Sequence, residues 1–144
     1  MPRTYTYEGQ CHCGAIRARL QFTKPAEEIE VRACQCGFCT RHGSMTISDP
    51  AGKTILEVRK GQLHAYQFAS RTATSLLCQS CGVYAGAILQ DGDDRWSVVS
   101  VRGLPIPEFL GRTPTPMIYD AETPDQRIAR RKAKWTPTEL RLID

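Results

Sequence analysis

The chain has 144 residues, a length typical of one domain, and with 24% charged and 41% hydrophobic residues it has the composition of a folded globular protein rather than a disordered one. No run reaches the roughly 18 apolar residues of a membrane-spanning helix, and residues 1–5 lack the apolar core of a signal peptide, so we expect a cytoplasmic protein. The net charge of +4 arises in one late stretch that contains Arg127, Arg130, Arg131, Lys132 and Lys134. Without that stretch the chain is nearly neutral, so general nucleic-acid binding is not expected.

Alternation of apolar and polar side chains predicts β-strands through most of the chain. It is clearest where Ile16, Ala18 and Leu20 alternate with polar residues. The same period, or a short apolar run between turn residues, predicts strands at residues 16–22, 29–33, 55–59, 63–68, 72–77, 83–90 and 96–101. The Asp-Gly pair within residues 91–94 predicts a hairpin turn before the last of these strands.

The pattern changes after residue 101. Four prolines between residues 105 and 116 predict an irregular loop. Thr123, Pro124 and Gln126 then have the spacing of a helix N-cap, a first helical residue and the second half of a capping box. Residues 127–135 are therefore predicted to form a short basic helix, which we interpret as a solvated surface helix in preference to a phosphate-binding patch.

Seven cysteines stand in three tight groups, which are Cys11 with Cys13, Cys34 with Cys36 and Cys39, and Cys78 with Cys81. A disulfide framework fits poorly, because the total is odd, the expected compartment is reducing, and a bridge within the first group would be strained. Seven unrelated buried thiols would not be expected to cluster in this way, although free cysteine is often buried. Thiolates are soft ligands that suit zinc, so we interpret the groups as metal ligands.

The three groups divide into four ligands and three. Structural zinc sites are closed by four protein ligands, whereas reactive sites keep one position open. We therefore predict a closed site at Cys11, Cys13, Cys78 and Cys81, where Gly14 and Gly82 allow a sharp bend behind each pair, and an open site at Cys34, Cys36 and Cys39. Two zinc ions per chain are expected, and the alternative in which the three-cysteine site is partly empty stays open.

Three motifs in this order carry a family resemblance. They are Cys11-His12-Cys13-Gly14 after Gly9, Cys34-x-Cys36-x-x-Cys39-Thr40-Arg41, and Cys78-x-x-Cys81-Gly82. Over residues 5–120 the chain resembles the glutathione-dependent formaldehyde-activating enzymes, a family that includes centromere protein V. The resemblance implies a mainly β, antiparallel β-tent zinc-binding fold, here followed by a short C-terminal helix. It also implies the same partition of the cysteines, with Cys34, Cys36 and Cys39 on the catalytic ion.

This resemblance divides the chain into a zinc-binding β domain at residues 5–120 and a basic helical tail at residues 121–144, packed on the domain or extending from it. Two departures are visible. Gln35 stands between Cys34 and Cys36 where many members have histidine, and residues 116–144 follow the usual aromatic ending poorly. The metal ligands are unaffected by either departure.

The function that these residues imply is a carbon–sulfur lyase-like reaction. Three thiolates make a zinc ion a weak Lewis acid, so the open position suits a soft ligand such as glutathione rather than an activated water. The thiol would then add to an aldehyde such as formaldehyde, or the adduct S-hydroxymethylglutathione would be cleaved in reverse. Arg41 is the candidate for a substrate carboxylate, although a surface ion pair would explain it equally well.

The histidines and several aromatic residues of the chain are expected to have structural roles rather than catalytic ones. His12, His42 and His64 are expected to be solvated or structural, and His12 should point away from its neighbouring ligands in an extended segment. Tyr66, Phe68 and Trp96 are expected to be core aromatics rather than a substrate platform.

The competing hypothesis is a non-catalytic zinc-binding module or a carrier of thiol adducts, in which the basic tail would engage an acidic partner. The partners expected under the first hypothesis are a small thiol and an aldehyde, with no membrane. Exposed sheet edges would allow a homodimer.

Overall fold

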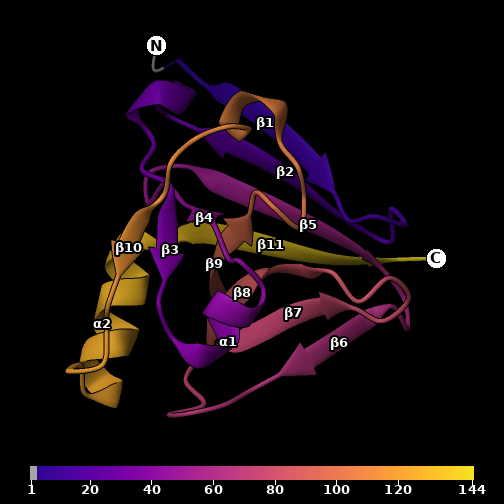
Figure 1. Cartoon of the computed structure of the whole chain (residues 1–144). Helices are drawn as coiled ribbons and strands as arrows, with labels where there is room; N and C mark the ends of the chain where they lie inside the picture. The colour runs from indigo at the N-terminus through magenta and orange to yellow at the C-terminus, as the bar shows by residue number, and fades with distance from the viewer. Residues whose placement is uncertain (1–2) are drawn as a thin grey trace.

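Strands dominate the computed structural model, which describes residues 3–144, so the first two residues of the stretch considered for a signal peptide lie outside it. The strands are β1 (Tyr5–Gln10), β2 (Ile16–Phe22), β3 (Arg32–Cys34), β4 (Thr46–Ile47), β5 (Lys53–Arg59), β6 (Leu63–Tyr66), β7 (Thr74–Cys78), β8 (Tyr84–Asp91), β9 (Asp94–Ser100), β10 (Thr115–Met117) and β11 (Thr136–Ile143). The helices are η1 (Ala26–Glu28), α1 (Gly37–Arg41), η2 (Pro107–Phe109) and α2 (Pro124–Lys134), and Figure 1 shows how they are placed.

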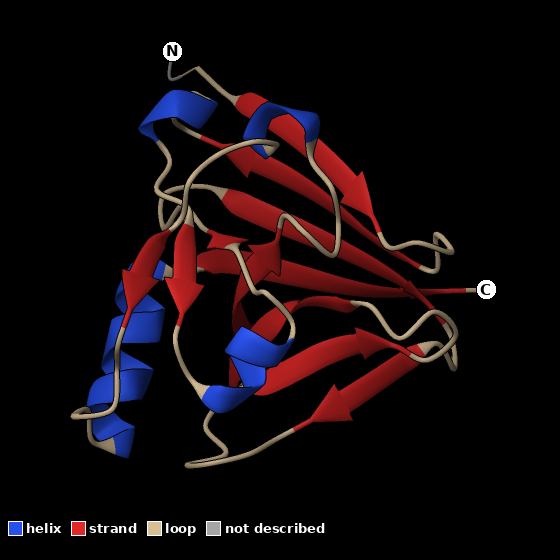
Figure 2. Ribbon diagram, viewed as in Figure 1, coloured by secondary structure: helices blue, strands red, loops and turns tan. Residues whose placement is uncertain are grey.

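One layer contains the strands at the two ends of the chain. β1 pairs antiparallel with β2, and β2 pairs antiparallel with β5. β11 lies on the other side of β5 and runs parallel to it over Thr138–Ile143. The C-terminal strand is therefore an interior strand, between β5 and the rest of the sheet (Figure 2).

The second layer is organised around β9. One edge of β9 pairs with β8, which continues to β7 and β6 in an antiparallel meander. The other edge pairs first with the start of β11, at Thr136 and Pro137, and then with β4. β4 leads to β3, and β3 pairs in parallel with β10. The two layers thus meet where β11 passes from β9 to β5.

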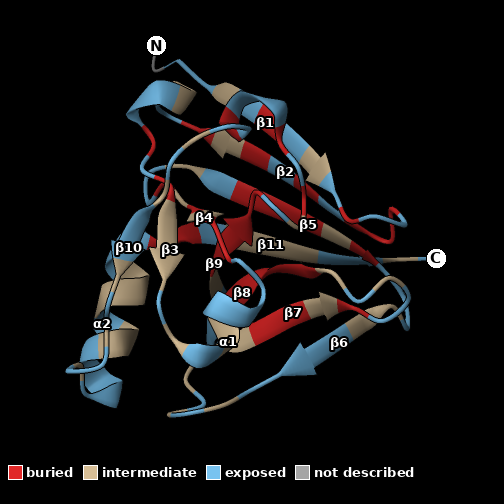
Figure 3. Ribbon diagram, viewed as in Figure 1, coloured by how far each residue is buried: buried red, intermediate tan, exposed pale blue. Residues whose placement is uncertain are grey.

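The main core fills the space between these layers. Its fully buried side chains include Phe22, Phe109, Ile16 and Leu104, and Figure 3 shows buried residues concentrated on the inner strands. A second, smaller cluster contains Trp135 with Ala87, Leu89 and Val98, and Ile128 of α2 packs against it. Burial of apolar area on this scale is the main stabilising term, and the second cluster holds α2 against β8 and β9.

The predicted fold class is confirmed as mainly β with a short C-terminal helix, and the alternating segments form strands close to the expected positions. The sheet is mixed, however, because the β3–β10 and β5–β11 pairs are parallel. The helix begins as expected, since Thr123 and Gln126 form both hydrogen bonds of a capping box. No helix among residues 3–144 is long and apolar enough to cross a membrane.

Four strands and three short helices were not predicted from the sequence, namely β1, β4, β10, β11, η1, α1 and η2. β10 lies in the segment expected to be irregular, where its partner β3 imposes the extended backbone. The boundary proposed at residue 120 stays a prediction. Residues 121–144 contain the expected helix and, in addition, the interior strand β11.

The interior position of β11 makes a prediction about truncation. A chain that ends at Trp135 should lose the cooperative thermal unfolding transition measured by far-UV circular dichroism, because β5 and β9 would both lose a paired neighbour. A chain that lacks only Asp144 is the control, since its ion pair with Lys60 is exposed and contributes less than about 1 kcal/mol. Equal unfolding temperatures for both truncated chains would contradict an interior role for β11.

Candidate functional site

Cys11, Cys13, Cys78 and Cys81 come together from two turns far apart in the sequence. Their sulfur atoms all lie within 4.8 Å of one another. The Sγ atoms of Cys13 and Cys78 are 3.5 Å apart, and those of Cys11 and Cys13 are 3.8 Å apart. Zn–S bonds of about 2.3 Å at tetrahedral angles place sulfur atoms about 3.8 Å from one another, whereas a disulfide would bring them to about 2.05 Å. The cluster therefore fits a tetrahedral metal ion.

Each of the two turns is shaped by a glycine, as the sequence predicts. Gly14 and Gly82 have φ values of 82° and 74°, in the left-handed region that other residues rarely adopt. The N–H of Gly14 donates to the carbonyl of Cys11, and the N–H of Gly82 donates to the carbonyl of Cys78. The resulting turns point sulfur atoms inward, where backbone N–H groups such as that of Ile16, 3.3 Å from Cys11 Sγ, stabilise negative charge.

The two ends of the Cys78–Cys81 turn differ in acidity without a metal ion. Burial raises the pKa of Cys78 to about 12. Burial also opposes ionisation of Cys81, but hydrogen bonds from the backbone N–H groups of Val83 and Cys13 outweigh it and lower the pKa of Cys81 to about 6. One thiolate is thus available near neutral pH to begin binding a cation, which would then displace the remaining protons.

The second cluster contains Cys34, Cys36 and Cys39 at the junction of β3 and α1. Cys34 ends β3, and Cys36 is the N-cap of the single-turn helix α1, with its sulfur 3.3 Å from the N–H of Cys39. The three sulfur atoms lie within 4.8 Å of one another, and all three residues are half-buried. The cluster of ligand side chains at this position stops at three within residues 3–144, with no histidine, aspartate, glutamate or further cysteine in the group.

The three thiols also share protons unequally. A hydrogen bond from the Cys39 thiol, acting against burial, lowers the pKa of Cys34 to about 6. The same hydrogen bond, together with burial, raises the pKa of Cys39. Tyr84 stands beside this cluster, and burial raises its pKa, so its phenol is neutral at physiological pH.

A cavity of about 240 Å³ opens directly on the three-cysteine cluster. Its walls come from β3, α1, β4, β7, β8, β9 and α2, from the segments next to α1, from the segment before β7 and from the segments on either side of α2. Apolar side chains such as Val98, Ala87 and Trp135 form part of the wall, and Tyr84 lies on the side of the cysteines. The cavity therefore joins a group able to hold a metal ion to a partly apolar space for a small ligand.

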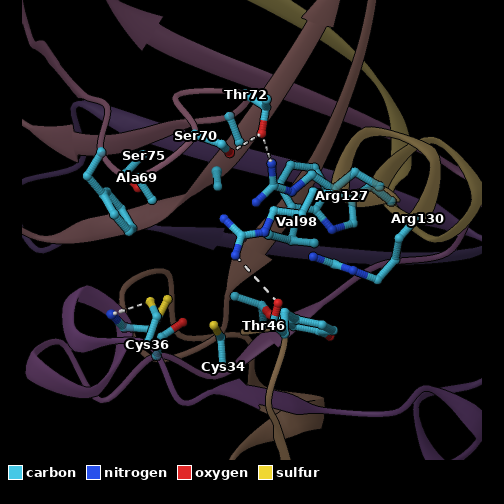
Figure 4. A pocket seen from close by; sticks show the side chains of 18 of the residues that line it. Cys34, Cys36, Thr46, Ala69, Ser70, Thr72, Ser75, Val98, Arg127 and Arg130 are labelled. Carbon is cyan, nitrogen blue, oxygen red and sulfur yellow. Dashed lines mark hydrogen bonds between the residues drawn. The ribbon is translucent and has the colours of Figure 1, made fainter. Parts of the chain in front are cut away.

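Four arginines line the same cavity, namely Arg32, Arg127, Arg130 and Arg131. Arg32 stands two residues before Cys34, on the same face of β3. The other three have i, i+3 and i+4 spacing and therefore share one face of α2. Figure 4 shows Arg127 and Arg130 across the cavity from Cys34 and Cys36. The expectation of a solvated basic helix is thus wrong for these three residues, which are half-buried at the cavity.

Arg41 lies elsewhere. It is exposed, its guanidinium donates to the carbonyl of Gly37 at 2.7 Å, and it is absent from the cavity wall. Its role toward a substrate carboxylate stays a prediction. His12, His42 and His64 are exposed, and His12 is outside the four-cysteine cluster although it stands between two of its members.

The aromatic residues were only partly assigned correctly. Trp96 packs against the smaller core cluster, as expected of a core aromatic. Tyr66 is instead 44% exposed and stacks on Phe38, with ring centroids 5.5 Å apart. Phe68, 5.2 Å from Phe38, lines the cavity. These rings form an aromatic rim over α1, because α1 places Phe38 between β6 and the start of β8.

Comparison with a solved structure supports the fold. The chain is similar to a Rhodobacter sphaeroides protein whose crystal structure was determined by structural genomics, with 28% sequence identity and a TM-score of 0.57. The match covers 76% of this chain and 99% of that chain. Part of this chain therefore lies outside the shared fold.

The part of the chain that matches a known protein family includes both cysteine clusters. Residues 6–104 match the family described as glutathione-dependent formaldehyde-activating enzyme. All seven cysteines fall within that range, whereas α2 and β11 follow it. The matched residues and the two cysteine clusters together show that the chain belongs to the glutathione-dependent formaldehyde-activating enzyme family.

Proposed function

We propose that this protein is a zinc-dependent carbon–sulfur lyase-like enzyme that forms or cleaves adducts between a small thiol, such as glutathione, and an aldehyde, such as formaldehyde. The observation that carries the proposal is the three-cysteine cluster, which ends at three ligands and opens on a cavity. The four-cysteine cluster is assigned a structural zinc ion and the three-cysteine cluster a reactive one. The donor set supports zinc, because thiolates are soft ligands and structural zinc sites are usually closed by four of them.

A zinc ion bound by Cys34, Cys36 and Cys39 would offer one position to a thiol and would favour the thiolate form of that ligand. In the forward direction the thiol sulfur forms a bond to the carbonyl carbon of the aldehyde. The thiol proton ends on the carbonyl oxygen, and no oxidant or reductant is needed. The reverse reaction breaks the same carbon–sulfur bond.

The residues of the cavity have separate roles in this reaction. Tyr84 is a neutral phenol beside the cysteines, so it can donate a hydrogen bond to the aldehyde oxygen as negative charge develops there. Phe68 and the apolar wall exclude water from the reacting groups. The aromatic rim of Phe38, Tyr66 and Phe68 reaches the cavity through Phe68.

The competing hypothesis of a non-catalytic module with a basic tail is less well supported. It requires the basic residues of α2 to be presented to an acidic macromolecule. Arg127, Arg130 and Arg131 instead line the cavity, and Lys132 pairs with Asp91. A cavity that contains both arginines and a three-ligand cluster favours a small ligand.

The direct test is adduct exchange. Zinc-loaded protein should accelerate interconversion of formaldehyde and glutathione with their S-hydroxymethyl adduct beyond the spontaneous rate, as measured by NMR exchange spectroscopy. The acceleration should disappear in Cys36→Ser. Exchange at the spontaneous rate with every thiol and aldehyde tried would refute the enzymatic proposal.

The division between the two metal sites makes a separate prediction. Purified protein should contain close to two zinc ions per chain by elemental analysis. Cys36→Ser should lose about one of them and keep its thermal unfolding transition, whereas Cys81→Ser should misfold, because binding of a structural zinc ion can contribute about 10–16 kcal/mol to folding. The same loss of stability in both variants would contradict the assignment.

Tyr84 supplies a further prediction. Tyr84→Phe should lower the exchange rate by about 100-fold or more while leaving the zinc content unchanged, because the ring stays but the donor is lost. Tyr66→Phe is the matched control, since Tyr66 belongs to the rim and stands outside the cavity wall. Full activity in Tyr84→Phe would remove Tyr84 from the mechanism.

A further inference from the structure

The guanidinium groups that line the cavity are closely spaced and incompletely paired. Among the hydrogen bonds of the described residues, Arg127 makes one contact of 3.5 Å, to the carbonyl of Tyr119. Arg131 donates to the Thr72 hydroxyl at 2.5 Å, but its Nε atom is buried without a hydrogen-bond partner. Arg32 donates from one Nη atom to the Ser48 hydroxyl. Each guanidinium has five N–H donors, so most donors on this wall have no hydrogen-bond partner among the described residues.

Arg130 has a different environment. Its Nε lies 2.9 and 3.0 Å from the two carboxylate oxygens of Glu122, and its guanidinium stacks on Tyr119 with 3.6 Å between its central carbon and the ring centroid. Glu122 therefore neutralises one of the four positive charges. Glu122 and the ring of Tyr119 together hold the planar guanidinium of Arg130 in a fixed orientation at the cavity.

The remaining guanidinium groups have few carboxylates near them in the cavity wall. Among the described residues that line the cavity, Asp120 is the one carboxylate, and it is exposed. Burial, followed by the charges of Arg130 and Arg127, lowers the pKa of Arg131. Fixed guanidinium groups in a half-buried wall are the usual receptor for an oxyanion, since they can form paired, charge-assisted hydrogen bonds.

We propose that this arginine wall, formed by Arg32, Arg127, Arg130 and Arg131, binds a carboxylate of the ligand, and that the thiol handled by this protein is therefore an acid whose carboxylate and sulfur both fit within one cavity. The inference rests on the proposed function for the thiol and adds its charge class. The cavity volume of about 240 Å³ lies below the range of about 300–1,000 Å³ that is usual for small-molecule sites, which favours a compact acid group within it.

The assignment also names the segment that determines specificity. Three of the four arginines belong to α2, which begins twenty residues after the end of the family match at residue 104. Arg32 belongs to the matched part and stands near Cys34. The reactive group and the anion receptor thus come from different parts of the chain, so α2 selects the ligand while the matched residues carry the cysteines.

The experiment compares two thiols that differ in one charge. Cobalt-substituted protein is titrated with 3-mercaptopropionate and with its methyl ester, and binding is followed through the thiolate-to-cobalt absorption bands. The carboxylate thiol should bind roughly tenfold or more tightly, as expected for charge-assisted hydrogen bonds. This preference should fall close to one in Arg127→Gln and in Arg131→Gln. Lys134→Gln is the matched control, because it removes an exposed charge from the same helix without touching the cavity.

Equal affinity of the wild type for the two thiols would overturn the inference, as would a preference that persists in both folded arginine variants. Unfolding temperatures of the variants separate loss of binding from loss of folding, and Arg127→Gln is the more tolerant site because Arg131 also packs on Trp135.

A second readout keeps the inference independent of the metal chemistry. Trp135 lines the cavity, so succinate, which has no thiol, should change its fluorescence saturably in the wild type and in Lys134→Gln but not in Arg127→Gln. If neither thiol perturbs cobalt while succinate binds in this way, the proposed function fails and the carboxylate receptor stands. A response to inorganic phosphate in the absence of any response to succinate would overturn the carboxylate assignment.

Discussion

Sulfur atoms from two turns, 65 residues apart in the sequence, meet within 3.5 Å at the edge of this molecule. The four-cysteine cluster connects the turn between β1 and β2 to the turn between β7 and β8, and these hairpins belong to different layers of the sheet. A metal ion held there would fix the separation of the two layers at one end. β7 and β8, which are joined by this turn, also line the cavity through Ser75 and Tyr84. The spacing of the layers therefore also affects the position of Tyr84.

The cavity has groups of opposite charge on its two sides. The readily ionised thiol of Cys34 places negative charge at the end of β3, and half-buried guanidinium groups concentrate positive charge on α2. Arg130 pairs with Glu122, and its positive charge also contributes to the lowered pKa of Cys34 across the cavity. A cation among the sulfur atoms and an anion among the arginines would each meet side chains of the opposite charge.

Patterns over a few neighbouring residues predicted the features of the structure that depend on local sequence. Alternation located most long strands, cysteine spacing predicted which thiols meet, and Thr123 with Gln126 predicted the start of α2. β11 also alternates, with Leu140 and Leu142 separated by Arg141, yet its place between β5 and β9 depends on pairings that no local pattern specifies. The arginines that line the cavity did carry a signal in the sequence. Arg127, Arg130 and Arg131 are spaced i, i+3 and i+4, so on a helix they form a single charged face. What the spacing could not reveal is that this face turns toward the cysteines.

The orientation of α2 follows from the strand that comes after it. Trp135 ends the helix and is buried against Ala87 and Val98, and the next residue, Thr136, already pairs with Ser97 of β9. The helix therefore cannot rotate freely about its axis, since its last turn is fixed by a buried ring and by the first residue of an interior strand. Counting back by four residues from Trp135 reaches Arg131 and then Arg127, so the face that carries Trp135 inward also carries the arginines to the cavity. A segment outside the family match thus contributes both an interior strand and three of the four arginines in the wall of the site.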